Sequence, residues 1–128
     1  MQQVNLTLEQ GKELAFNCLI SNGCDDANAE ATAENMITAE RDGCSSHGLF
    51  RLPGYVISLK NGKINGRAAP VIKKSASSIL RIDGKRGMAP LAHTIGKKAI
   101  IERAHDQGVV ITAFVNIFHM AALWLDVE

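Results

Sequence analysis

The chain has 128 residues, of which 46% are apolar and 21% charged, and its net charge is +1. This composition excludes a disordered chain, and the near-zero net charge gives no electrostatic footprint for nucleic acid or an anionic membrane. The longest apolar run, 109–118, is interrupted by Thr112 and Asn116 and is too short to span a bilayer. The first residues lack the basic and apolar regions of a signal peptide, so we expect no membrane partner.

Two helices are expected before Gly43. Thr7 and Gln10 have the spacing of a capping box, which predicts a first helix that ends near 22–23 and carries several apolar residues (Leu8, Leu14, Ala15, Cys18 and Leu19). Asp25 or Asp26 then caps a second helix, which stops at Gly43 and has its own set of apolar residues (Ala29, Ala33, Met36 and Ile37).

A third helix is expected over 49–61, because its apolar residues are spaced three, four and three apart (Leu49, Leu52, Val56 and Leu59). Pro53 belongs in its first turn, where a missing N–H costs nothing. Arg51 and Tyr55 then share another face, and His47 lies one turn earlier. Residues 45–47 fall in the turn that enters the helix, where free N–H groups and the helix dipole favour anions. The stretch 41–55 therefore predicts a binding site for a substrate carboxylate.

After Gly66 the pattern changes to a β-β-α-β order. The runs 70–74 and 78–82 read as short strands, and 83–84 reads as a turn. Pro90 begins a long helix that runs through 107 and stops at Gly108, with four residues facing inward (Leu91, Ile95, Ala99 and Ala104). Gly96 within it indicates close packing. The apolar run 109–115 predicts a buried strand, and His119 follows it.

The elements predict an α/β (α+β) fold in two parts. Residues 1–66 form an α-helical N-terminal segment, and 67–128 form a β-β-α-β segment that opens the core domain. The run 123–128 has no glycine cap or polar tail, so we expect a truncated chain. The odd set of three cysteines suits a reducing, cytoplasmic location (Cys18, Cys24 and Cys44).

Each candidate site residue also has an ordinary interpretation. Taken alone, His47 is an ordinary helix-entry residue, Arg51 is a solvated one, and Tyr55 is half-buried packing. Ser46 serves equally as a helix cap. Cys44-x-x-His47 has a metal-compatible spacing, but no second pair lies nearby, so no metal site is expected. Residues 83–87 are interpreted as a plain turn rather than a phosphate-binding loop. His93 and His105 are interpreted as surface residues.

The residues also resemble a known family. Its N-terminal signature is matched by Arg41-Asp42-Gly43, Ser46-His47-Gly48, Arg51-Leu52-Pro53 and Tyr55. This pattern is similar to that of the malate/L-lactate dehydrogenase-type oxidoreductases, which are distinct from the Rossmann lactate and malate dehydrogenases. The family includes ureidoglycolate, sulfolactate and diketogulonate enzymes and reductases of piperideine- and pyrroline-carboxylates. Two later stretches are similar as well (Ile82-Asp83-Gly84 with Gly87, and Asn116 with His119). No Gly-x-Gly-x-x-Gly occurs, which fits the family's different nucleotide fold.

The resemblance implies an NADH or NADPH cofactor and a small substrate with a carboxylate beside a C=O, C–OH or C=N group. It makes His47 the general acid/base, Ser46 and Arg51 the carboxylate ligands, His119 a second histidine at the site, and Tyr55 a pocket residue. The chemistry agrees, because an imidazole transfers protons near neutral pH and a guanidinium donates two parallel hydrogen bonds to a carboxylate. The product would be a 2-hydroxy acid or a cyclic amino acid.

The chain differs from the family pattern in two respects. The aspartate that pairs with the catalytic histidine lies further along in family members, and the stretch 117–120 is less polar than in relatives. We expect a homodimer. The alternative is a catalytically silent module that associates with a partner chain, suggested by the apolar terminus and the missing cofactor segment.

Overall fold

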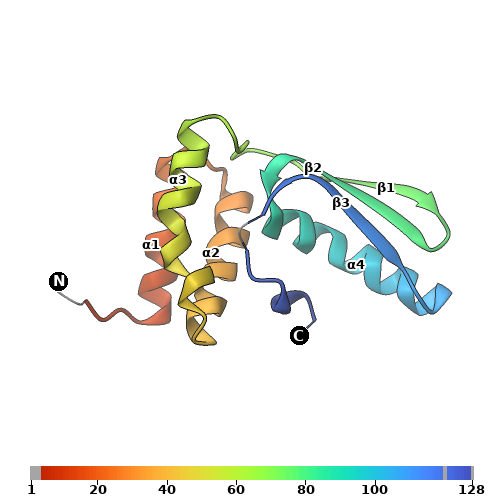
Figure 1. Ribbon diagram of the computed structural model, residues 1–128, viewed down its shortest axis with the longest axis horizontal. Coiled ribbons are helices and arrows are strands. Elements are labelled where there is room, and N and C mark those ends of the chain that lie inside the picture. The colour runs from red at the N-terminus through yellow and green to blue at the C-terminus, as the bar shows by residue number, and fades with distance from the viewer. Residues whose placement is uncertain (1–3, 120, 128) are drawn as a thin grey trace.

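The computed structural model describes residues 4–119 and 121–127, without the side chains of Lys74 and Asp126. Three helices, α1 (Leu8–Ser21), α2 (Asp26–Arg41) and α3 (Leu52–Lys60), stand together at one end. At the other end, α4 (Ala89–Gln107) runs along a sheet of β1 (Val71–Ala76), β2 (Ile79–Met88) and β3 (Ile111–Phe118) (Figure 1). The predicted α+β class is confirmed. Among the described residues, no helix combines the length and apolar character needed to cross a membrane.

The first two helices begin and end as the capping signals predict. The Gln10 N–H donates to Thr7 Oγ1 at 3.1 Å and the Thr7 N–H donates to Gln10 Oε1 at 2.9 Å. Asp25 rather than Asp26 caps α2. The apolar residues predicted on α2 are buried, whereas on α1 Ala15 and Leu19 are buried and Leu8 and Leu14 are 44% and 52% exposed. Gly11 makes the close contact instead, because a Cβ there would lie 2.9 Å from Ile37 Cδ1.

The third predicted helix is two elements. A 3₁₀ turn, η2 (Leu49–Arg51), precedes α3, and Asn61 follows as the C-cap. Tyr55 is only 1% exposed and packs in the core, with its ring 6.3 Å from that of Phe118. Tyr55 therefore belongs to the core, whereas Arg51 is only half-buried.

The sheet has the order β1-β2-β3, with β1 antiparallel and β3 parallel to β2. The buried strand predicted over 109–115 is instead the edge strand β3, and Val109 and Ile111 are each 65% exposed. The predicted long helix, its start at Pro90 and its stop at Gly108 are confirmed. Gly96 allows it to pack on Ile82, whose side chain fills the place of a Cβ. Ile95, predicted to face inward, is 40% exposed.

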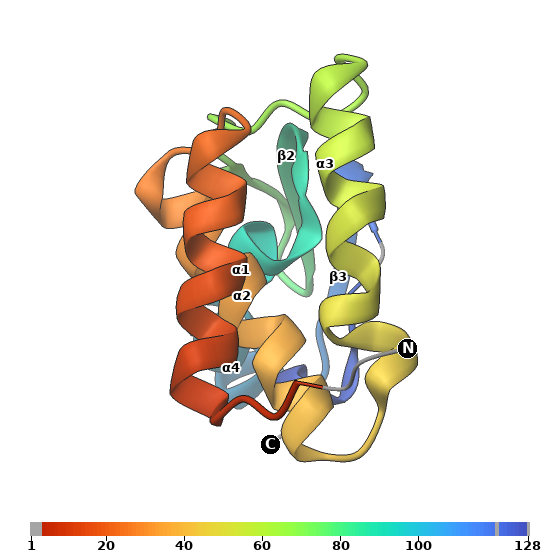
Figure 2. The same ribbon diagram turned by 90° about the vertical axis from the view of Figure 1, so that its left-hand side faces the viewer.

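The predicted turn at 83–84 is a bulge inside β2. Pairing with β3 passes from Asp83↔Val115 to Gly87↔Ile117, so β2 carries extra residues at this point. Lys85 and Arg86 have φ values of 54° and 64°. The strand bends but does not reverse, and Met88 reaches the core between the helices, with β2 seen behind α1 and α3 in Figure 2. Because of the bulge, β2 pairs within the sheet along most of its length, and its last residue packs against the three N-terminal helices.

Candidate active site at the Ser-His-Gly turn

The Ser-His-Gly turn lies against the end of α2. Two 3₁₀ turns, η1 (Ser45–His47) and η2, meet at Gly48. The Leu49 N–H donates to Glu40 Oε1 at 2.8 Å. Gly48 is buried, and a Cβ at this position would overlap the Glu40 carboxylate. Glycine therefore allows a close approach at this position, where its φ of -88° is not left-handed.

Ser46 contacts both of the neighbouring candidate side chains. Its hydroxyl lies 3.1 Å from Nδ1 of His47, and its carbonyl accepts a 2.6 Å hydrogen bond from Nε of Arg51. Neither Nε2 of His47 nor the terminal nitrogens of Arg51 bond to any other residue that the structure describes. These atoms are therefore available to a ligand.

An open cavity of about 420 Å³ brings three of the predicted site residues together: His47, Arg51 and His119. Its other walls come from Ala121, Leu123 and Trp124. A volume of this order accommodates a small molecule. Ser46 lies at its edge through its contacts with His47 and Arg51. Tyr55 is not among the lining residues, because its side chain is taken up in the core.

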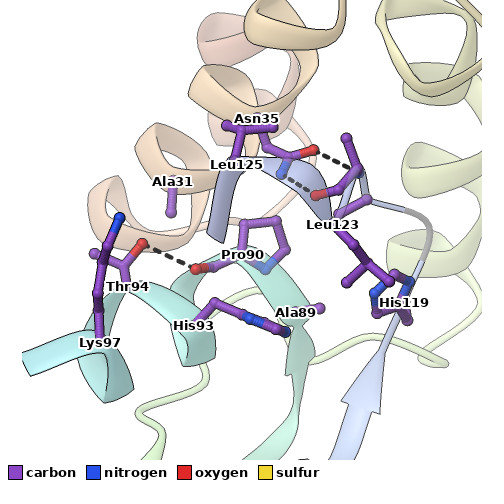
Figure 3. A pocket seen from close by; sticks show the side chains of 12 residues that line it. Ala31, Asn35, Ala89, Pro90, His93, Thr94, Lys97, His119, Leu123 and Leu125 are labelled. Carbon is purple, nitrogen blue, oxygen red and sulfur yellow. Dashed lines mark hydrogen bonds between the residues drawn. The ribbon is translucent and has the colours of Figure 1, made fainter. Parts of the chain in front are cut away.

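The far wall is built by a segment after β3 that the sequence interpretation missed. Asn35, 8% exposed on α2, donates from Nδ2 to the Ala122 carbonyl at 2.9 Å and accepts from the Ala122 N–H at 3.0 Å (Figure 3). Trp124 donates from Nε1 to Asp42 Oδ2 at 2.9 Å. Its ring meets that of His47 edge-on, with centroids 5.7 Å apart. A signal for Asn35 did exist, since α2 buries a polar row at helical spacing (Asn28, Thr32 and Asn35).

A second cavity of about 220 Å³ adjoins the first and shares His119, Ala121 and Leu123 with it. Figure 3 shows it between α2 and α4, with His93 and Lys97 on its α4 side. His93 stacks on Phe114 with centroids 4.1 Å apart and is half-buried, so its prediction as a surface residue is wrong. The first cavity is lined by an imidazole and a guanidinium, from His47 and Arg51. The second is lined by apolar residues and by Lys97. This division suits two ligands that meet near His119.

Asp42, the carboxylate that binds Trp124, has a lowered pKa. The Arg41 guanidinium, and then the Trp124 indole, lower the pKa of Asp42, so this carboxylate stays ionised under ordinary conditions. In the part of the chain that the structure describes, no group of three or more His, Cys, Asp or Glu side chains is arranged to hold a metal ion. The imidazole of His47 is suited to proton transfer and the guanidinium of Arg51 to anion binding.

Comparison with known proteins gives a consistent result. The family model for malate/L-lactate dehydrogenase matches residues 6–128. The Delta(1)-pyrroline-2-carboxylate reductase of Ancylobacter novellus is 38% identical over 127 residues, covering 99% of this chain and 37% of that protein. The (2R)-3-sulfolactate dehydrogenase (NADP(+)) of Chromohalobacter salexigens is 34% identical over 123 residues, covering 96% of this chain and 37% of the relative.

Solved structures show the same likeness in three dimensions. The crystal structure of delta1-piperideine-2-carboxylate reductase from Pseudomonas syringae pv. tomato superimposes with a TM-score of 0.92 at 36% identity. The match covers 98% of this chain and 38% of that structure. The chain thus spans little more than a third of the length of the relatives that it matches.

Proposed function

Since the chain belongs to the malate/L-lactate dehydrogenase family, we propose that it carries the proton-transfer and carboxylate-binding part of an NAD(P)H-dependent oxidoreductase site. The substrate is a 2-oxo acid or a cyclic imine carboxylate, and the product is a 2-hydroxy acid or a cyclic amino acid. The relatives named for pyrroline- and piperideine-carboxylates favour the cyclic imine.

The observation that carries this proposal is the convergence of His47 and Arg51 on one cavity. Arg51, held at Nε by Ser46, offers its terminal nitrogens to a carboxylate as a planar pair of donors. His47, held at Nδ1 by the Ser46 hydroxyl, has Nε2 for exchange of a proton with substrate. A substrate bound by Arg51 therefore presents its adjoining C=O or C=N group to an imidazole.

The reduced nicotinamide supplies the hydride to the carbon of that group when it is bound. His47 gives a proton to the oxygen or nitrogen as the electron pair moves there, and it accepts the proton in the reverse reaction. Leu123 and Trp124 cover one side of the cavity and limit the entry of water. His119 and Leu123 border both cavities, so a nicotinamide ring held in the second cavity would lie beside the substrate, where His93 and Lys97 would be among the polar groups that contact it.

The substitution His47→Ala tests the proposal. We expect turnover of 1-pyrroline-2-carboxylate and pyruvate with NADH or NADPH to fall by about 100-fold or more, as loss of a general acid predicts, while cofactor affinity stays within about twofold. His105→Ala, at the exposed end of α4, is the matched control and leaves turnover unchanged. Unchanged turnover in His47→Ala would count decisively against the assignment.

A second candidate is a catalytically silent module that associates with a partner chain. The exposed apolar residues Val109 and Ile111 beside the edge of β3 favour it. Fluorescence titration with NADH and NADPH, together with light scattering, separates the two. A monomer that binds cofactor excludes the silent module, and an assembly that binds none supports it. The cytoplasmic location and the homodimer remain predictions from the sequence.

A further inference from the structure

We propose that Asp42 is a positioning residue, which holds the indole of Trp124 against His47 and so fixes the orientation of both side chains in the cavity. The consequence for catalysis rests on the proposed function. The contact itself does not, and it is tested separately below.

The contact is specific in its geometry. One carboxylate receives the Trp124 indole N–H at 2.9 Å and the Arg41 guanidinium at 2.8 Å and 3.2 Å. The Trp124 ring then meets the His47 ring at 73°, the edge-to-face arrangement that aromatic pairs favour. Residues 82 positions apart in the chain are joined by this single side chain.

Asp42 is well placed to act as a fixed point. It is the C-cap of α2, and its own N–H bonds to the Thr38 carbonyl at 3.0 Å. Gly43, with φ of 74°, then turns the chain toward η1 and His47. The end of α2 therefore positions both rings: it binds the indole of Trp124 through Asp42, and it leads through Gly43 into the turn that carries His47.

Asn35 anchors the same segment independently. It fixes the backbone of Ala122, while Asp42 fixes only the ring of Trp124. Loss of Asp42 should therefore release the ring and leave the segment attached. Asp42 does not line the cavity, so its effect on a reaction passes through Trp124 and His47.

Trp124 is the only tryptophan in the chain, so its emission reports this contact directly. A protonated imidazole quenches a touching indole more strongly than a neutral one. In the wild-type chain we expect the emission to rise when the His47 imidazole loses its proton, and we expect His47→Gln to abolish this step. Among the residues that the structure describes, the other ionisable groups around His47 are Arg51 and His119 in the cavity, the Arg41–Asp42 pair behind the indole, and Glu40 against Gly48.

Asp42→Ala is expected to reduce the amplitude of the step at least twofold and to shift the emission to longer wavelength. Asp42→Asn, whose amide oxygen still accepts from the indole, should retain most of the amplitude. Asp106→Ala, an exposed carboxylate on α4, is the matched control and retains all of it. A full step in Asp42→Ala, or a step that survives His47→Gln and disappears in His119→Gln, overturns the proposal.

A second measurement needs no variant and guards against an unstable Asp42→Ala chain. Hydrogen exchange of the Trp124 indole N–H, followed by NMR, should be at least 10-fold slower than in a free indole, and exchange at the free rate overturns the proposal. In the active enzyme, Asp42→Ala should lower kcat about 10-fold with cofactor KM unchanged, which is less than the roughly 100-fold cost of a 1 Å misplacement because Asp42 acts only through Trp124 and His47. If His47→Ala leaves turnover intact, the proposed function fails, whereas the emission and exchange measurements still decide the contact.

Discussion

At the scale of single residues, a missing methyl group decides how closely the Ser-His-Gly turn lies on α2. The Glu40 carboxylate occupies the space where a Cβ of residue 48 would stand, and from there it accepts the Leu49 N–H. Glycine in this motif is thus explained by contact with a carboxylate. The motif and the end of α2 form one packed unit that positions His47.

Gly48→Ala should displace Glu40 and break its bond to Leu49, at a cost of about 1.5–3 kcal/mol in the free energy of unfolding, the range for hydrogen bonds to charged groups. Urea denaturation measures it. In a Glu40→Ala background, Gly48→Ala should lower the free energy of unfolding less, because neither the Glu40 carboxylate nor its hydrogen bond from Leu49 is present. Glu13→Ala, on the exposed side of α1, is the control background and should show no coupling. Additive costs for Gly48→Ala and Glu40→Ala would contradict this explanation.

The sequence predicted the residues of this site unevenly. The motif and the order of elements predicted His47, Arg51 and His119, and these three residues line one cavity. Asn35, Asp42 and Trp124 were not predicted, since each acts through a hydrogen bond to a group 82 or 87 positions away in the chain. No local pattern encodes such a contact, although a polar residue within a buried helix face is a sign that a partner exists.

At the scale of elements, the bulge in β2 is held by Asp83. Its Oδ1 accepts from the Lys85 N–H at 3.0 Å and from Asn116 Nδ2 at 3.1 Å, and its Oδ2 accepts from Lys85 Nζ at 3.1 Å. Lys85, Arg86 and Asn116 all have positive φ, a conformation that costs free energy outside glycine. The carboxylate offsets this cost by organising both strands at the bend.

The same bonds make the contribution of Asp83 depend on pH. The Lys85 N–H, then the Asn116 amide and the Lys85 ammonium, lower the pKa of Asp83 to about 2. The unfolded value is about 3.9, so the stabilisation is present above pH 4 and is lost as pH falls toward 2. The difference in unfolding free energy between wild type and Asp83→Asn should therefore shrink between about pH 4 and pH 2. Asn116→Ala should show part of this effect, and a difference that is constant with pH in Asp83→Asn would refute it.

Helices were predicted better than strands for a physical reason. Capping residues and stop glycines act within a few positions, so Thr7, Asp25 and Gly108 mark helix ends correctly. Whether a strand is central or at an edge depends on which strands pair with it. The apolar run around Ile111 was therefore predicted as buried, and Asp83-Gly84 as a reversal, when only the pairing between β2 and β3 distinguishes a bulge from a turn.

At the scale of the whole molecule, the site lies where the helical end meets the sheet. The helical end supplies His47 and Arg51, and the chain leaving β3 supplies His119 and Trp124. The outer edge of β3 exposes Ile111 next to Val109, a surface that proteins ordinarily cover. The division into 1–66 and 67–128 remains a prediction, although the site's two walls come from opposite sides of that boundary.

The proposed site requires Arg51 to bind a carboxylate beside His47, and one binding measurement tests this most directly. Pyrrole-2-carboxylate, a planar analogue of the cyclic imine acid, is titrated into the chain while Trp124 emission is followed, with the neutral pyrrole-2-carboxamide as the matched ligand. We predict saturable binding of the carboxylate, at least about 10-fold weaker in Arg51→Met, as loss of a charge-assisted bidentate pair implies, and weak binding of the carboxamide to both. Equal affinity of wild type and Arg51→Met for the carboxylate, or no preference for it over the carboxamide, would contradict the account.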